Sequence, residues 1–321
     1  MKKKLLCVSL SLLLLTGCSD SANALLSYSE QDSNAEFDIE NVEGTEAAEY
    51  FAEDLTVIPD ELNHMVEASI TATSGLAVNR TDNEVVYANN VYERMYPASL
   101  TKLITALVVL KNADLSDTVT VSYKASHITE NGAKLCGFKE GDKINLEVLL
   151  NSLLVYSGND AGVAIAEHVG GSVEEFAAMM NETAVSIGAV HSNFVNPHGL
   201  HDDNHYTTAY DLYLIFNELL NYDEFVSIIN QTSYTANYKN ASGESVAKEF
   251  TTTNRYLKGT EDAPEDVTVI GGKTGTTSKA GNCLILYSKN IRDKDYISLI
   301  LHADSGDSLY DQMTFLLEKI E

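Results

Sequence analysis

Residues 97–111 of the chain read PASLTKLITALVVLK, and this stretch decides how the rest of the sequence is interpreted. Apolar residues recur at helical spacing from Leu100 to Leu110, so the run predicts a buried helix over Ser99–Lys111. Ser99 then lies at the helix N-terminus, where the positive end of the helix dipole favours an oxygen that gains negative charge. Serine is also a common N-cap at such a position. Taken alone, Ser99 therefore fits either a nucleophile or a cap.

Lys102 follows Ser99 by three residues and therefore projects from the same face of the helix. Because Leu100 and Leu103 flank it, we expect burial to disfavour the ammonium and to lower the pKa of the amine. A neutral lysine can accept the serine proton, so the pair predicts a nucleophile and its general base. Ser245–Lys248 has the same S-x-x-K spacing, but we expect it in a polar loop with no apolar helix behind it.

A second string, Ser157-Gly158-Asn159, falls between two apolar helical runs. It predicts a turn, with Asp160 as the cap of the next helix, from which side chains can enter a cleft. We expect the Ser157 hydroxyl to relay a proton, and the Asn159 amide to hold a substrate carbonyl and to orient the lysine. A plain helix-to-helix turn is also a natural place for these residue types.

A third string, Lys273-Thr274-Gly275-Thr276, follows a predicted strand that ends in two glycines, which permit close approach by another backbone. A peptide substrate can pair along such a strand. We expect Lys273 to lower the Lys102 pKa and to attract a carboxylate, to which Thr274 and Thr276 offer hydroxyls. The backbone N–H groups of Ser99 and Thr276 are the expected oxyanion hole. A Gly- and Thr-rich bend without function is the alternative.

The order of the predicted elements favours an α+β fold with a mostly antiparallel sheet, because a block of helices splits the strands. The predicted strands are Ser74–Asn79, Glu84–Ala88, Ser233–Tyr238, Val267–Gly272, Asn282–Ser288 and Tyr296–His302. The predicted helices are Ser99–Lys111, Leu146–Tyr156, Ala161–Val169, Val173–Ile187, Thr208–Leu220 and Ser308–Lys319.

The three strings in this order resemble the penicillin-binding and serine β-lactamase superfamily, and more closely the low-molecular-weight serine D-Ala-D-Ala carboxypeptidases. The closer resemblance rests on PASLTK at 97–102, SGNDA at 157–161, NPHGL at 196–200 and GKTGTT at 272–277. It implies a five-stranded antiparallel sheet flanked by helices, beside an all-helical subdomain, with the site between them. Some relatives also place an arginine before the KTG strand to bind the substrate carboxylate, and Arg255 is near that point. The predicted catalytic residues are Ser99, Lys102 and Ser157, and the predicted substrate-binding residues are Asn159, Lys273, Thr274, Gly275 and Thr276.

The resemblance implies removal of the terminal D-alanine from peptidoglycan stem pentapeptides through an acyl ester on Ser99, with penicillins as covalent inhibitors. No cofactor or metal is predicted, because His198, His201 and His205 lack a regular ligand spacing. Three alternatives stay open. The first is a β-lactamase, for which Glu218 only faintly matches the deacylating glutamate. The others are an endopeptidase or transpeptidase on cross-linked wall, and a β-lactam sensor that is acylated without turnover.

The N-terminus predicts export. Three lysines precede the apolar run Leu5–Leu15, which is too short to span a bilayer and is typical of a signal-peptide core. The run ends in Leu15-Thr16-Gly17-Cys18, which resembles the bacterial lipoprotein processing box. We therefore predict a lipoprotein signal peptide over residues 1–17 and a lipid on Cys18, anchoring the protein on the outer face of the cytoplasmic membrane, towards the cell wall. Ordinary cleavage after Ala22-Asn23-Ala24 is the alternative.

The composition is strongly acidic, with 47 Asp and Glu against 21 Lys and Arg and a net charge of −26. This charge argues against nucleic acid and against electrostatic adhesion to anionic lipid, which leaves the Cys18 lipid as the expected membrane contact. Residues 18–58 are predicted to be an acidic, disordered tether, and residues 59–321 a single catalytic domain. We expect a monomer, as is common in the family. Cys136 and Cys283 are expected to be free thiols, with a disulfide as the alternative.

Overall fold

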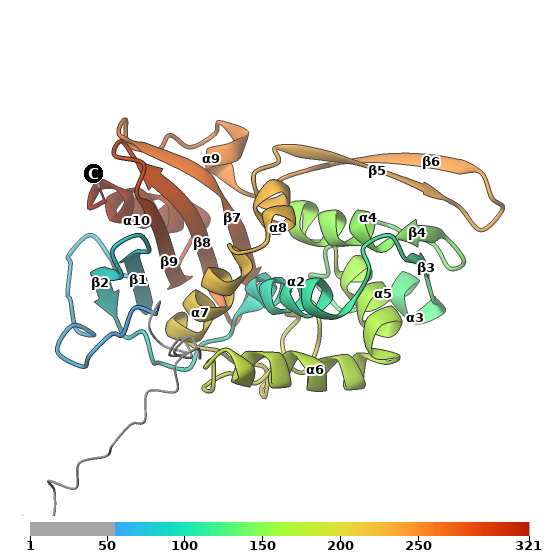
Figure 1. Cartoon of the computed structure of the whole chain (residues 1–321), viewed down its shortest axis with the longest axis horizontal. Helices are drawn as coiled ribbons and strands as arrows, with labels where there is room; N and C mark the ends of the chain where they lie inside the picture. The colour runs from blue at the N-terminus through green and yellow to red at the C-terminus, as the bar shows by residue number, and fades with distance from the viewer. Residues whose placement is uncertain (1–54, 321) are drawn as a thin grey trace, which may run out of the picture. The chain divides into compact units, whose positions relative to one another are not determined.

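A five-stranded antiparallel sheet forms the centre of the computed structural model, which describes residues 55–320 (Figure 1). Its strand order is β2-β1-β9-β8-β7, so the first hairpin of the domain joins its last three strands. The strands are β1 (Ser74–Asn79), β2 (Glu84–Asn89), β7 (Val267–Thr277), β8 (Gly281–Asn290) and β9 (Asp295–Ala303). The predicted α+β class and the five-stranded antiparallel sheet are confirmed.

The predicted leader, Cys18 and most of the predicted tether lie outside the described residues. Thr56 and Ile58 are already buried, so packing includes residues just before Pro59. Within residues 55–320, no helix has both the length and the apolarity needed to cross a membrane.

The sheet separates two hydrophobic cores, because successive side chains of a strand point to opposite faces. On β8, Cys283 and Ile285 join the larger core on the face towards the helical subdomain, whereas Leu284 and Leu286 join the smaller core under α10 (Gly306–Glu318). The larger core continues without a break into the helices between β2 and β7. The sheet therefore fixes where those helices lie.

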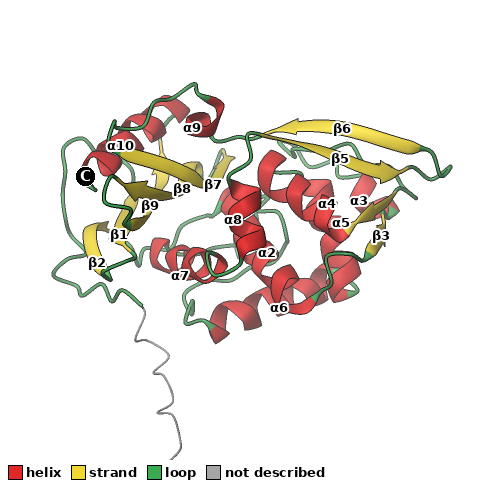
Figure 2. Cartoon of the chain, turned by 45° about the horizontal axis from the view of Figure 1, so that its top comes forward, coloured by secondary structure: helices red, strands yellow, loops and turns green. Residues whose placement is uncertain are grey.

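Helix α2 (Thr101–Asn112) lies among the other helices of the helical subdomain (Figure 2). Its residues from Thr101 to Val109 are all buried. A 3₁₀ turn, η2 (Ala98–Leu100), precedes it. The other helical elements between β2 and β7 are α3 (Tyr123–Ser126), α4 (Leu146–Asn151), the π-helical turn η3 (Ser152–Tyr156), α5 (Asn159–Gly170), α6 (Val173–Ser186), α7 (Ala209–Leu219), α8 (Asp223–Ile229) and α9 (Arg255–Lys258).

The subdomain predicted to be all-helical also carries a second sheet, of order β3-β4-β5-β6, so that prediction is wrong. Its strands are β3 (Thr118–Thr120), β4 (Lys143–Asn145), β5 (Ser233–Lys239) and β6 (Ser245–Thr251). The first two are too short to produce an alternating pattern. The exposed polar residues of β6 resemble a loop, yet Ser245–Lys248 pairs with β5 as a strand. This β5–β6 hairpin extends beside α4 as a two-stranded ribbon (Figure 1).

Two element boundaries differ from prediction at places that matter for the site. Strand β7 does not end at Gly272, because pairing with β8 continues as far as Thr277 and overrides the weak strand preference of its glycines. The helix predicted over Leu146–Tyr156 is divided into α4 and the π-helical turn η3. Such π-helical turns are frequent at functional sites.

Gly272→Ala should destabilise the fold strongly, because a Cβ there would lie 2.1 Å from the carbonyl oxygen of Ile285 on β8. Relieving that overlap requires two paired strands to separate, so we expect a loss of about 3 kcal/mol in the free energy of unfolding, measured in urea. Gly75→Ala is the control in the same sheet, since its Cβ would meet only the ends of the Tyr87 and Ile300 side chains within 3.5 Å. Equal losses in the two variants would contradict this interpretation.

Candidate active site

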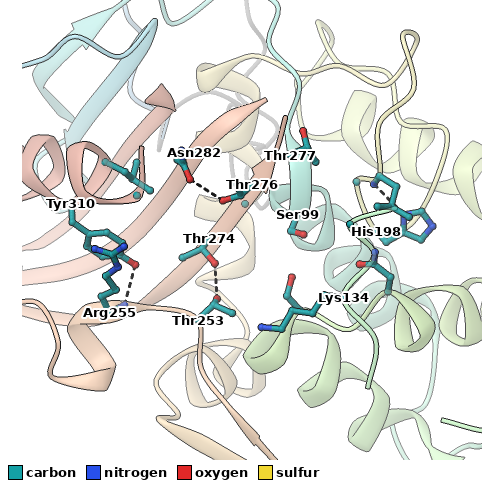
Figure 3. Close-up of a pocket in the computed structure, with 18 residues that line it drawn as sticks. Ser99, Lys134, His198, Thr253, Arg255, Thr274, Thr276, Thr277, Asn282 and Tyr310 are labelled. Carbon is teal, nitrogen blue, oxygen red and sulfur yellow. Dashed lines mark hydrogen bonds between the residues drawn. The ribbon is translucent and has the colours of Figure 1, made fainter. Parts of the chain in front are cut away.

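A cleft of about 350 Å³ lies between β7 and the helical subdomain, and it contains most of the predicted site residues (Figure 3). Figure 3 shows Ser99 between Thr276, on the strand side, and His198, on the helical side. Lys102 and Lys273 lie beneath the cleft and are 0% and 1% exposed. The predicted residues that line the cleft are Ser99, Ser157, Asn159, Thr274, Gly275 and Thr276.

The Lys102 amine is held by three neutral oxygens. Its Nζ lies 3.0 Å from Ser99 Oγ, 2.8 Å from Asn159 Oδ1 and 2.7 Å from the His198 carbonyl oxygen. As an ammonium, it donates one hydrogen to each. As a neutral amine, it has two hydrogens for Asn159 and His198, and its lone pair then faces the Ser99 hydroxyl. The geometry therefore suits transfer of the serine proton to the lysine.

Electrostatics favour the neutral form of this amine. Burial, followed by the nearby charge of Lys273, lowers the Lys102 pKa well below its usual value. Lys273 Nζ in turn donates to Ser157 Oγ and to the Thr274 carbonyl oxygen, each at 3.0 Å. Burial, followed by Lys134, lowers the Lys273 pKa to about 7. Lys102 thus contacts Ser99, and Lys273 contacts Ser157. Among the described residues, neither lysine has a carboxylate as a hydrogen-bond partner.

Ser99 does not act as a cap: the caps of η2 and α2 are Pro97 and Leu100, and neither accepts a hydrogen bond from the helix through its side chain. The residue before Ser99, Ala98, has a φ of 47°, which is strained for a side chain of this type. Thr101 Oγ1 donates to the Ala98 carbonyl oxygen at 2.8 Å and lies 2.7 Å from His205 Nε2. These contacts hold the strained turn that presents the serine.

The turn containing Ser157 is held by a carboxylate that was predicted to be a helix cap. Helix α5 begins at Asn159 after Gly158, and Gly158 provides no side-chain cap. Asp160 instead accepts hydrogen bonds from the N–H groups of residues 136–138, at 2.8, 2.7 and 3.2 Å. Ser157 itself has a φ of 74°, at the end of η3. The π-helical turn and Asp160 thus fix the second string against the loop that precedes β4.

Strand β7 passes close to the nucleophile because Gly275 has no side chain. A Cβ at Gly275 would lie 3.0 Å from the backbone nitrogen of Ser99 and 3.1 Å from the Pro97 carbonyl oxygen. Two hydroxyls beside it have fixed partners: Thr274 Oγ1 is 2.5 Å from Thr253 Oγ1, and Thr276 Oγ1 donates to Asn282 Oδ1 at 3.2 Å. The close approach brings the backbone of the third string next to that of Ser99.

The three histidines of the 196–205 region have structural partners. His205 Nδ1 accepts from the backbone of Val195, and His201 pairs with Asp203. Burial lowers the pKa of His198 to about 3 and that of His205 to about 4, so both are neutral. Within residues 55–320, no group of three His, Cys, Asp or Glu side chains is placed to hold a metal ion.

Several residues that line the cleft were not assigned to the site from the sequence. Arg255, at the start of α9, donates to Asp307 at 2.7 Å and lies over the Tyr310 ring. Its position before the KTG strand was the only sequence signal for it. Lys134 and Thr253 come from loops that carry no recognisable motif. The unassigned lining residues that have side-chain polar groups include Lys134, Thr253, Arg255, Thr277, Asn282 and Tyr310.

A serine and a buried lysine between an antiparallel sheet and a helical subdomain are the arrangement of the penicillin-binding superfamily, and the comparisons with known proteins agree. The sequence model of the peptidase S11 family, described as D-alanyl-D-alanine carboxypeptidase, matches residues 61–305. The chain therefore belongs to the peptidase S11 family.

Individual relatives give the same result. The chain is 32% identical over 261 residues to the D-alanyl-D-alanine carboxypeptidase DacF of Bacillus subtilis, and 31% identical over 263 residues to DacC of Escherichia coli. Each match covers 78% of this chain and 62% of the relative, so the chain spans less than two thirds of their length. A DD-transpeptidase of Streptomyces strain K15 is similar in structure, with a TM-score of 0.73 and 26% identity, covering 79% of this chain and 98% of that one.

The lowered Lys273 pKa makes a prediction about stability. Between a folded pKa of about 7 and the ordinary value of 10.5, the unfolded chain holds a proton that the folded chain lacks, so stability rises with pH in this window. From pH 7 to pH 9, the free energy of unfolding of the native protein should rise by about 2 kcal/mol relative to Lys273→Met. Urea unfolding at both pH values measures it. Replacing the exposed Lys279 by methionine should produce no such pH-dependent difference; the idea fails if the two variants behave alike.

Proposed function

We propose that this protein is a serine D-Ala-D-Ala carboxypeptidase, which removes the terminal D-alanine from peptidoglycan stem pentapeptides through an acyl-Ser99 intermediate. One observation carries the proposal. A fully buried Lys102 amine lies 3.0 Å from Ser99 Oγ and has no carboxylate that would keep it charged within hydrogen-bond reach among the described residues. Membership in the peptidase S11 family gives this pair its reaction.

In the acylation step, neutral Lys102 takes the Ser99 proton while Ser99 Oγ attacks the carbonyl carbon of the penultimate D-alanine. The oxygen of that carbonyl becomes negative, and the N–H groups of Ser99 and Thr276 stabilise it, a contribution of about 3 kcal/mol or more per donor in comparable sites. The approach of β7 at Gly275 supports this assignment, because it brings both backbones to one place.

The leaving amine needs a proton when the C–N bond breaks. Ser157, whose Oγ accepts from Lys273 Nζ at 3.0 Å, relays this proton: its hydroxyl hydrogen passes to the amine. Ser157 then takes up the proton that Lys102 removed from Ser99, which returns Lys102 to its neutral form. The carboxylate of the departing D-alanine is placed by the hydroxyls of Thr274 and Thr276 and by the charge of Lys273. Water activated by Lys102 then hydrolyses the ester, which restores the serine. A penicillin enters in the same way, but its bulky ester deacylates slowly.

One alternative has a specific observation behind it. The Streptomyces structure with a TM-score of 0.73 is a DD-transpeptidase, so the same site can in principle pass the acyl group to an amine on another peptide. A β-lactamase is less well supported, since none of the described residues that line the cleft is Asp or Glu. Glu218, the residue with a faint resemblance to a deacylating glutamate, pairs with Lys111 at 2.6 Å on the surface.

Ser99→Ala should remove both covalent labelling by a fluorescent penicillin and D-alanine release from a pentapeptide ending in D-Ala-D-Ala, with a loss of at least about 10³-fold. Labelling is measured on a gel, and D-alanine by a coupled oxidase assay. Ser245→Ala is the matched control, because it alters the other S-x-x-K sequence, on exposed β6, and should leave both signals intact.

The outcomes of this experiment separate the alternatives. Persistent labelling with D-alanine release supports the carboxypeptidase. Rapid destruction of penicillin would identify a β-lactamase instead. Labelling without release would identify a sensor or an enzyme restricted to cross-links, and release of D-alanine only when an acceptor amine is added would identify a transpeptidase.

We further propose that the protein is exported and held on the outer face of the cytoplasmic membrane by a lipid on Cys18, and that its catalytic domain is monomeric. The support comes from the sequence: a basic start, a short apolar run and Leu15-Thr16-Gly17-Cys18. The negative net charge of −26 supplies no other attraction to an anionic membrane surface. The acidic residues that follow Cys18 would then act as a spacer between the membrane and the catalytic domain.

Cys18→Ser should move the full-length protein from the membrane fraction to the soluble exported fraction and abolish incorporation of labelled palmitate. The physical reason is that a lipid thioether requires the cysteine sulfur, and the two acyl chains of a lipoprotein are enough for stable anchoring. Cys7→Ser, within the predicted leader, is the control and should change neither result. Continued membrane retention of Cys18→Ser without label would contradict the lipid anchor and favour an uncleaved leader.

A further inference from the structure

The cleft is free of carboxylates in a chain that is rich in them. The chain has 47 Asp and Glu residues, yet none of the described residues that line the cleft is acidic. Two cations line it, Arg255 and Lys134, and Figure 3 shows them on opposite sides of Thr253 and Thr274. Arg255 is paired with Asp307, whereas the Lys134 ammonium has no hydrogen-bond acceptor or ion-pair partner within residues 55–320. One cation of the cleft is therefore uncommitted.

Lys134 is held in place although its ammonium is free. Its carbonyl oxygen accepts from the backbone N–H of Asn159 at 2.7 Å, and its Nζ lies 4.1 Å from the centre of the Tyr156 ring. The loop just after it is fixed from two further sides, by the Asp160 carboxylate and by Lys248. Lys248 Nζ donates to the carbonyl oxygens of residues 136 and 137 at 2.8 and 2.9 Å. This rigidity means that little side-chain or loop entropy is lost when a ligand binds the ammonium.

The neighbour of Lys134 indicates which half of a substrate it meets. Asn159 Oδ1 is occupied by Lys102, so its amide nitrogen remains free to hold a carbonyl of the acyl half, as proposed above. Lys134 is bonded through its backbone to this same Asn159. In the mechanism proposed above, the carboxylate of the departing D-alanine is placed by Thr274, Thr276 and Lys273. Lys134 is therefore left without an assigned anion, and a second anionic group of the substrate is the partner that fits it.

We propose that Lys134 is a specificity-determining residue that binds a carboxylate carried by the acyl half of the peptide substrate, in the residues that precede the D-Ala-D-Ala pair. The inference rests on the proposed carboxypeptidase function. Burial lowers the Lys134 pKa, and the charge of Lys258 lowers it further by a smaller amount. A bound carboxylate acts in the opposite direction and raises this pKa, because it favours the ammonium. Lys134 also contributes to the lowered pKa values of Lys102 and Lys273.

The test uses three peptides of the form Nα-acetyl-L-lysyl-D-Ala-D-Ala, whose lysyl side chain is succinylated for the anion, acetylated for the neutral form, or unmodified for the cation. The readout is kcat/KM for D-alanine release. The native enzyme should prefer the anionic peptide over the neutral one by about 10-fold, the value of one charge-assisted hydrogen bond. A fourth peptide carries the carboxylate one residue further from the scissile bond. Comparing its kcat/KM with that of the succinylated peptide shows at which of these two substrate positions Lys134 binds a carboxylate.

Variants then locate the preference. Lys134→Gln should reduce the anionic-to-neutral ratio to within about 2-fold, Lys134→Arg should keep it, and Lys134→Glu should favour the cationic peptide. Lys258→Gln is the control: it removes an exposed positive charge near Lys134 that does not line the cleft, and it should leave the ratio unchanged. A ratio of rates, unlike a single rate, cancels any effect of Lys134 on Lys102 and Lys273 that the peptides share.

The possible results lead to distinct conclusions. If the native enzyme releases D-alanine from all four peptides at the same kcat/KM, the inference about Lys134 is overturned but the proposed carboxypeptidase function is not. This outcome does not depend on whether any variant folds. If Lys134→Gln keeps the preference for the anionic peptide, another cation binds the carboxylate, and the inference about Lys134 is likewise overturned. If the native enzyme neither releases D-alanine nor reacts with benzylpenicillin, then the proposed function itself has failed. Benzylpenicillin labelling of each variant shows whether its site is folded.

Discussion

An amine buried without a negative partner is the constraint on which the rest of this structure depends. Lys102 is 0% exposed and is surrounded by the oxygens of Ser99, Asn159 and His198, all of them neutral. A carboxylate in this place would stabilise the ammonium and end its ability to take a proton. Each of the three oxygens comes from a different segment of the chain, so the turn η2, the start of α5 and the 196–200 loop must all be in place before the amine is satisfied.

The strained and close-packed backbone positions follow from this constraint. Ala98 and Ser157 both have positive φ values. Ala98 directly precedes Ser99, whose hydroxyl contacts Lys102, and Ser157 accepts a hydrogen bond from Lys273. Gly199 would collide with the Ala98 carbonyl oxygen if it carried a Cβ, at 1.7 Å, and Gly275 approaches the Ser99 backbone from the other side. Such strain is tolerated only where surrounding contacts over-determine the conformation, as Thr101 does for Ala98. The larger hydrophobic core supplies that rigidity, because α2 is buried along most of its length.

The sequence predicted the site better than it predicted the framework around it. Ser99, Lys102, Ser157, Asn159 and Lys273 were named from short strings whose chemistry is local, and the structure brings them together. What escaped prediction was set by tertiary contacts. Strand β7 extends beyond Gly272 because β8 pairs with it, and the residues of β6 form a strand because β5 lies beside them. Lys134 had no motif of its own, and the loop that follows it is held by Asp160 and Lys248, which were interpreted as a cap and as part of a loop.

The acceptor that His198 supplies to Lys102 is a main-chain oxygen, and this has a genetic consequence. No codon change at position 198 can delete it, in contrast to Asn159, whose acceptor disappears with a single nucleotide. This side of the lysine can therefore be loosened only by moving the polypeptide, and neighbouring Gly199 leaves little room for that. Of the two protein acceptors other than Ser99, the one at position 198 is therefore protected against substitution and the one at position 159 is exposed to it.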